Sequence, residues 1–247
     1  MRVIYILWLR QLKRFFRSKA RIVGSIGQPL LFLVALGFGM GSVFAKAGEG
    51  NYILFLSPGV IAMTILFSSI FTGVDVILDR QFGFLKEALV APVSRFKIII
   101  GRTLGGATTA MLQGLIVFII AIPLGFHPNW VMLPIAILFM FLIALFFTAL
   151  GTSIGSILKD MQAFQLIMNF LVMPIFFLSG ALFPIDESSK IFKYILAINP
   201  LAYGVDGIRG SLTGVFHFNM GIDLVVLFVI TVIVLRVGSY LFSRIEV

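Results

Sequence analysis

The chain has 247 residues, of which 60% are hydrophobic and only 12% charged. Soluble domains carry about 25% charged residues, and 27 phenylalanines are more than a single small core could bury. The composition therefore excludes a soluble protein and predicts an all-α integral membrane protein. In a membrane protein, a net charge of +9 first indicates how the chain is oriented in the membrane. We expect no nucleic-acid partner. The absence of cysteine excludes disulfides and thiol-ligated metals.

Residues 1–21 are too basic to cross a membrane and form an amphipathic pattern. The basic stripe of this helix consists of Arg10, Arg14, Arg17 and Arg21, and the apolar side across from it consists of Trp8, Leu12, Phe15 and Phe16. The pattern predicts an interfacial helix along the anionic membrane surface, in contact with membrane lipids. The apolar run that follows and Ala45-Lys46-Ala47 could indicate a signal peptide, but the run is longer than the usual apolar region of one.

Six apolar runs are long enough to cross a bilayer as helices, because about 20 residues suffice. They cover residues 22–45, 53–74, 103–125, 131–157, 163–183 and 221–242. The runs are continuous rather than alternating, which favours helices over the strands of a barrel. Glycines four apart in 37–41, 101–105 and 151–155 indicate close helix packing, within the chain or between two copies. We expect one transmembrane domain over residues 1–247, with spans one to five in 22–183.

Basic residues predict the orientation. Of the 19 Lys and Arg residues, only Lys46, Lys190, Lys193 and Arg209 fall between spans on one side, and the remaining 15 fall on the other. Because basic flanks stay in the cytoplasm, we expect a multi-pass protein of the plasma (inner) membrane with both termini cytoplasmic. The external segment, residues 184–219, contains short apolar stretches around Asn199-Pro200. It is interpreted as two short re-entrant helices or as an ordinary surface loop with a short helix.

Motifs for catalysis are missing from the sequence. There is no G-x-x-x-x-G-K-[ST] phosphate loop and no H-E-x-x-H zinc pair. The two histidines, His127 and His217, fall in predicted external loops. We therefore expect a chain that is not an enzyme and holds no metal. The spans contain neutral polar residues that could line a substrate route or form hydrogen bonds between helices: Gln28, Thr64, Thr108, Thr109, Gln113, Thr152, Ser153, Gln165 and Asn169.

The cytoplasmic stretch from Asp79 to Pro92 departs from this apolar background. A single helical stripe would contain Leu78, Phe82, Leu85 and Leu89, with Arg80, Lys86 and Glu87 beside it and Asp79 as the helix N-cap. The proline ends the pattern. A short amphipathic helix of this kind either lies flat on the membrane or docks in a groove of another protein.

Two motifs resemble the ABC transporter type-2 (ABC-2) permease family. The first is Asp79-Arg80-Gln-Phe-Gly83 followed by Pro92-Val-Ser94, although the residue after the glycine is Phe84, where that family often has Thr. The second is Ser179-Gly180-Ala-Leu-Phe-Pro184, followed by Asn199-Pro200-Leu-Ala-Tyr203 and then Asp206 and Arg209. The order of these motifs and the topology are most similar to the drug- and nodulation-factor-exporter branch.

The resemblance implies the transmembrane subunit of an exporter for a hydrophobic or amphipathic substrate such as a lipid, drug or glycoconjugate. It implies an ABC ATPase partner that binds ATP and Mg²⁺, no cofactor in this chain, and a second permease copy, as a homodimer or a heterodimer. The implied coupling helix contacts the ATPase through Asp79, Arg80, Phe82, Leu85, Lys86, Glu87 and Leu89. The implied external-helix motif comprises Gly180, Pro184, Asn199, Pro200, Tyr203, Asp206 and Arg209.

Two other functions are compatible with the composition. A stand-alone channel or secondary carrier would need no partner, but carriers usually place ionisable groups inside the membrane, and the central parts of these spans have none. A membrane-embedded lipid transferase would need clustered acidic or histidine residues near one interface. The acids Asp75, Asp79 and Glu87 are the one cluster of note for that chemistry.

Overall fold

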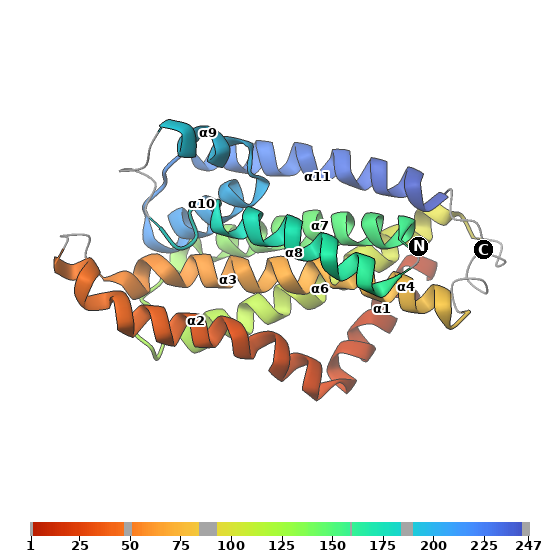
Figure 1. Ribbon diagram of the computed structural model, residues 1–247, viewed down its shortest axis with the longest axis horizontal. Coiled ribbons are helices and arrows are strands. Elements are labelled where there is room, and N and C mark those ends of the chain that lie inside the picture. Colours follow the sequence, from red (N-terminus) through yellow and green to blue (C-terminus); the bar gives the residue numbers. More distant parts are fainter. Residues whose placement is uncertain (1, 47–50, 84–92, 159, 184–189, 244–247) are drawn as a thin grey trace.

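The computed structural model describes residues 2–46, 51–83, 93–158, 160–183 and 190–243. Within these ranges the chain is helical and contains no strand, which confirms the predicted all-α class (Figure 1). The helices are α1 (Arg2–Arg17), α2 (Lys19–Lys46), α3 (Tyr52–Ile70), α4 (Thr72–Gln81), α6 (Arg95–Ala121), η1 (Trp130–Met132), α7 (Leu133–Ile157), α8 (Met161–Phe177), α9 (Lys190–Ile198), α10 (Pro200–Thr213) and α11 (Met220–Ser243).

Five helical runs in the described ranges are long and apolar enough to cross a membrane. They are Ile22–Gly41, Tyr52–Gln81, Arg95–Ala121, Trp130–Ile157 and Met220–Phe242. The fifth span predicted over 163–183 is not confirmed, because the helix there, α8, has only 17 residues. At 1.5 Å per residue α8 is about 26 Å long, which is less than the roughly 30 Å of a bilayer core. The protein is therefore multi-pass, with five full-length spans and one shorter apolar helix in the described part.

The helices run back and forth between two ends of an elongated bundle (Figure 1). One end, the α1 end, gathers α1, the last turn of α4 and the first turn of α6. The other end, the α10 end, gathers α9, α10 and the loop that carries η1. In Figure 1 the α1 end lies on the right and the α10 end on the left.

The second transmembrane run is longer than predicted. It was expected over 53–74, but α3 continues through Phe71 into α4, and the apolar run ends only at Gln81. The added residues include Asp75 and Asp79, both buried, and Arg80. Charged residues therefore do lie within this run, at the α1 end of the bundle.

The helix α8 stops at Phe177 although the apolar sequence continues. Pro174 lies in its last turn, where the ring removes a backbone donor, and Gly180 then adopts a φ of 72°. The bent segment packs against α3 so closely that a Cβ on Gly59 would lie 2.3 Å from the carbonyl oxygen of Ala181. Non-helical backbone at membrane depth is tolerated where protein covers it, and the buried Ala181 satisfies that condition.

Glycines allow the backbone of α7 to contact the backbone of the second transmembrane run directly. A Cβ on Gly151 would lie 2.4 Å from the carbonyl oxygen of Ile70, and one on Gly155 would lie 2.3 Å from that of Gly73. Small residues let transmembrane helices approach this closely. The predicted packing role of Gly151 and Gly155 is therefore confirmed within one chain. By contrast, a Cβ on Gly39 would meet no atom within 4 Å.

Replacing Gly155 by alanine should destabilise the protein. The added methyl group must push α4 and α7 apart, which we expect to cost about 1–3 kcal/mol in the free energy of unfolding. The matched control is Gly39→Ala, which adds the same methyl group where space is open and should be neutral or stabilising by up to about 1 kcal/mol. Denaturant unfolding in mild detergent measures both. Equal effects of the two variants would contradict the backbone contact.

Candidate functional site

The N-terminal helix α1 packs against α6 through glycine. A Cβ on Gly105 would lie 2.7 Å from the Cβ of Gln11, and one on Gly101 would lie 3.0 Å from the carbonyl oxygen of Ile4. The indole Nε1 of Trp8 donates a hydrogen bond of 3.1 Å to Thr108 Oγ1. One face of α1 is therefore covered by protein, and only its outer face is left for the membrane contact predicted for residues 1–21.

A buried carboxylate connects three helices at the α1 end. Asp79 on α4 accepts from Arg102 of α6 at 2.7 Å and from both terminal nitrogens of Arg10 of α1, at 3.1 and 3.2 Å. Arg102 is 2% exposed and also donates to the backbone oxygen of Asp75 at 3.2 Å. Asp79 lies inside α4, so its predicted role as an N-cap of a separate helix is wrong.

A second ion pair runs alongside the first. Arg14 of α1 lies 3.2 Å from Asp75 of α4, four residues before Asp79. Arg10 and Arg14 are likewise four residues apart, so two adjacent turns of α1 face two adjacent turns of α4. Part of the basic stripe that we interpreted as facing lipid headgroups therefore faces acidic side chains. Asp75 and Asp79, two of the three acids considered for transferase chemistry, are therefore partners in these ion pairs.

The first residues of the predicted coupling segment, Asp79 and Arg80, belong to the last turn of α4. Arg80 donates to the backbone oxygens of Leu158 at 3.0 Å and Ser156 at 2.5 Å, which fixes the end of α4 to the end of α7. Phe82 is 80% exposed, and Gly83 has a φ of 78°. A continuous helical stripe through Leu78 and beyond is therefore wrong, because the helix ends at Gln81. The other predicted contact residues, Leu85, Lys86, Glu87 and Leu89, lie outside the described residues.

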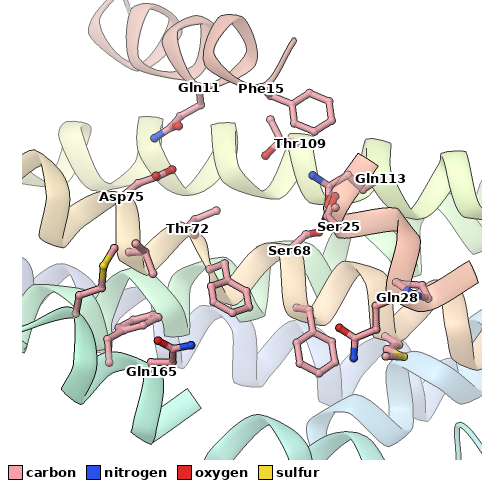
Figure 2. A pocket seen from close by; sticks show the side chains of 18 residues that line it. Gln11, Phe15, Ser25, Gln28, Ser68, Thr72, Asp75, Thr109, Gln113 and Gln165 are labelled. Atoms are coloured by element: carbon pink, nitrogen blue, oxygen red, sulfur yellow. Dashed lines mark hydrogen bonds between the residues drawn. The ribbon is translucent and has the colours of Figure 1, made fainter. Parts of the chain in front are cut away.

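A cavity of about 510 Å³ lies beside this network (Figure 2). Gln11 and Phe15 of α1 lie on one side of it, and Gln28 of α2 and Gln165 of α8 lie on the other. Its remaining lining includes apolar side chains from α3, α4 and α8 and the polar residues Ser25, Ser68, Thr72, Asp75, Thr109 and Gln113. Residues of α1, α2, α3, α4, α6 and α8 all contribute to its lining.

Four of the nine neutral polar residues noted in the sequence line this cavity. They are Gln28, Thr109, Gln113 and Gln165. The hydroxyl groups of Thr64, Thr108, Thr152 and Ser153 instead donate to carbonyls one turn earlier in their own helices, and Asn169 is exposed. We predicted that these residues either line a substrate route or form hydrogen bonds between helices. Neither alternative describes all of them, because most of the hydroxyl groups donate to a carbonyl of their own helix.

The external-helix motif assembles at the α10 end. Asn199 caps α10, its side chain accepting from Leu201 N at 3.0 Å and donating to Ile175 O at 2.6 Å, and Pro200 takes the first helical position. The hydroxyl of Tyr203 donates to Ala197 O at 2.6 Å. Two short helices, α9 and α10, therefore occupy the described part of this segment, and their re-entrant position in the membrane stays a prediction. Pro184 lies outside the described residues.

Arg209 fastens α10 to the bend after α8. It donates to the carbonyl oxygens of Gly180 at 3.0 Å and Ala181 at 3.4 Å, and it lies 4.0 Å from the centroid of the Phe55 ring. Burial lowers the pKa of the guanidinium to about 10, against the opposing effect of the Asp206 carboxylate. The group therefore stays charged at neutral pH, and it joins α3, α8 and α10.

Two acids and an aromatic residue complete the α10 end, and the sequence pattern missed part of this arrangement. Asp206 accepts hydrogen bonds from the backbone nitrogens of His217 at 2.8 Å and Phe218 at 2.8 Å. Asp223, in the first turn of α11, is fully buried, and neither of its carboxylate oxygens has a hydrogen-bond partner among the described residues. Tyr52 donates to the carbonyl oxygen of Leu182 at 3.1 Å, a contact that no local pattern could have identified.

Removing the Asp79 carboxylate should have a large effect on stability. Asp79→Leu leaves the buried Arg102 without its ion-pair partner, which we expect to cost about 3–5 kcal/mol. Arg10→Gln removes a partly exposed partner while the Asp79–Arg102 pair remains, and should cost no more than about 1 kcal/mol. Denaturant unfolding in mild detergent compares the two variants. A loss below about 1 kcal/mol for Asp79→Leu would contradict the buried network.

Replacing Arg209 by leucine should loosen the α10 end. The carbonyls of Gly180 and Ala181 lose a charged donor, which we expect to cost about 1.5–3 kcal/mol. Arg236→Leu, on the exposed side of α11, is the matched control and should stay within about 0.5 kcal/mol of the wild type. Hydrogen exchange on residues 178–183 locates the effect. Unchanged exchange there would refute the fastening role.

The match to known proteins covers most of the chain. A sequence model of the ABC-2 type transporter family matches residues 2–213. Nodulation protein J of Rhizobium leguminosarum bv. viciae is 28% identical, covering 91% of this chain and 87% of that protein. The transport permease ycf38 of Cyanophora paradoxa is 28% identical, covering 98% and 88%. The chain is therefore a membrane transport permease that belongs to the ABC-2 type transporter family.

Proposed function

We propose that this chain is the transmembrane subunit of an ATP-driven exporter that is energised by a separate ABC ATPase. The observation that carries the proposal is the family match over residues 2–213. The family supplies membrane transport components, and this sequence contains no phosphate loop of its own. ATP and Mg²⁺ would then be bound by the partner subunit. Two permease copies, identical or related, would form the pathway for a hydrophobic or amphipathic substrate such as a lipid, drug or glycoconjugate.

We place the α1 end on the cytoplasmic side of the plasma membrane, together with both termini. The distribution of basic residues supports this orientation, because only four of the 19 fall on the other side. The segment after Gly83 would then face the ATPase. Since Arg80 and Asp79 fix the end of α4 to α7, α1 and α6, a push on this segment would reach several helices together and shift them between two packings.

The cavity lining argues against an ion-coupled carrier, which was the alternative function. Its one charged residue is Asp75, which is paired with Arg14. A carrier would need an ionisable group free to exchange its ion. The neutral lining is suited instead to a substrate whose movement is driven from outside the cavity.

The proposal predicts a bound ATPase that is lost when the α4 end is altered. The tagged chain is expressed with its genomic neighbours and purified in mild detergent, and the eluate is tested for a P-loop ATPase. Phe82→Asp and Leu85→Asp should each reduce co-purification at least tenfold, because a charge would enter an apolar groove. Val131→Asp changes an equally exposed residue at the α10 end, 83% exposed against 80% for Phe82, and should have no effect.

Two results would overturn the assignment. Recovery of no ATPase with the wild-type chain would contradict the exporter, and equal recovery with all variants would contradict the contact surface. Ion flux or uptake by the purified chain alone in liposomes would favour the channel or carrier.

A further inference from the structure

The cavity between α1 and α8 contains glutamine side chains whose hydrogen-bonding groups are unused. Gln11 is 8% exposed and lines the cavity, yet its amide has no hydrogen-bond partner among the residues that the structure describes. The same holds for the amides of Gln28 and Gln165 in the described part of the chain. Gln113 accepts from Ser68, which leaves its amide NH₂ available. Glutamine amides that line a cavity and make no bond to the protein are available to a ligand that supplies hydrogen-bond partners.

The hydroxyl groups in the lining favour the same kind of ligand. Ser25, Thr72 and Thr109 each donate to a carbonyl of the preceding turn, so they offer acceptor lone pairs rather than donors. Glutamine offers both a carbonyl acceptor and two N–H donors. The lining as a whole therefore complements groups that donate and accept at once, namely hydroxyls and amides.

The charges of the lining exclude the other ligand classes. Asp75 is the one ionisable residue among the lining residues, and Arg14 lies 3.2 Å from its carboxylate. An anionic group would meet no free cation there, and a cationic group would compete with an arginine already in place. Transfer of an unpaired charge into such a site is strongly unfavourable.

The rest of the lining is mainly apolar. Met63, Phe67, Phe71 and Phe164 come from α3, the α3–α4 junction and α8. Gln28 and Gln165 are exposed lining residues on the side away from α1 (Figure 2). Exposed polar groups together with several apolar side chains in one lining match an amphiphile. The volume of about 510 Å³ lies within the roughly 300–1,000 Å³ typical of small-molecule pockets.

We propose that this cavity is a binding site, within a single chain, for an uncharged amphiphile whose polar part carries hydroxyl or amide groups. The inference rests on the proposed function, because it names the class of molecule that the exporter takes from the membrane. The ligand enters between α2 and α8, and its polar part bonds to the amides of Gln11, Gln28, Gln113 and Gln165. The α1 helix closes the far side, held by the Arg14–Asp75 pair.

Photo-crosslinking tests this site directly. The purified chain in phosphatidylcholine nanodiscs is incubated with three amphiphiles that share one photoreactive acyl chain and differ in headgroup: glycerol, phosphate or trimethylammonium. Peptide mapping should show saturable labelling of the cavity lining by the glycerol probe, at least tenfold above the two charged probes, and competition by the unlabelled glycerol compound. Equal labelling by a charged probe, or labelling confined to the outward faces of the helices as for bulk lipid, would overturn the proposal.

Matched glutamine variants show whether the amides carry the binding. Gln165→Leu and Gln28→Leu, both at exposed positions that tolerate an apolar side chain, should each weaken binding of the glycerol probe roughly three- to tenfold. Gln162→Leu makes the same change on α8, at an exposed position outside the cavity lining, and should leave binding unchanged. Identical affinities for all three variants would refute the role of the amides.

The labelling experiment uses no ATPase, so its result is independent of co-purification. If the ATPase co-purifies and the cavity is not labelled by the glycerol probe, this inference alone fails. If the cavity is labelled and no ATPase is recovered, the exporter assignment fails, and the cavity remains a lipid-binding site of a permease that is not driven by an ATPase.

Discussion

The carboxylate of Asp79 is shared between Arg102 on α6 and Arg10 on α1, and the arrangement of the α1 end follows from that sharing. Burying the Arg102 guanidinium, which is 2% exposed, carries a desolvation cost that one ion pair barely offsets. The additional bond from Arg102 to the Asp75 backbone oxygen contributes to the balance. We infer that the network favours one register of α1 against α4, because a shift by one turn would separate Arg10 and Arg14 from the aspartates that they contact here.

The cavity depends on the same register. Gln11 lies between Arg10 and Arg14 in sequence but on the inner side of α1, so the ion pairs that face α4 also set the position of the Gln11 amide in the cavity wall. Asp75 belongs to both features, since it pairs with Arg14 and lines the cavity. The end of α4, the N-terminal helix and the cavity therefore form one connected unit, and a displacement of any of them changes the other two.

The sequence predicted the features that depend on local patterns. Continuous apolar runs identified a helical membrane protein, and Asn199-Pro200 marked the junction of two short helices because one residue caps and the other starts α10. The length of α8 was not predictable from hydropathy, since the apolar run continues past Phe177 while Pro174 and Gly180 end the helix. Composition measures how apolar a segment is and does not show whether its backbone stays helical.

The candidate site depends on contacts between distant residues, and single-sequence periodicity could not pair them. Arg10 and Asp79 are 69 residues apart in the chain. One signal was present, namely two arginines four residues apart near the N-terminus and two aspartates four residues apart at the end of the second transmembrane run, which form complementary faces if the helices meet. Whether they meet is decided by Gly101 and Gly105, which admit α1 against α6. For the glutamines of the cavity, the sequence indicated their membrane depth but not the direction of their side chains.

The intrinsic fluorescence of Trp8 can report on the packing of α1. The sequence has two tryptophans. The indole of Trp8 bonds to Thr108 where α1 meets α6, while Trp130 is 59% exposed at the α10 end. Their emission therefore originates at opposite ends of the bundle. With Trp130 replaced by phenylalanine, the fluorescence of the remaining indole follows the docking of α1 in real time, and no label has to be attached to a protein that contains no cysteine.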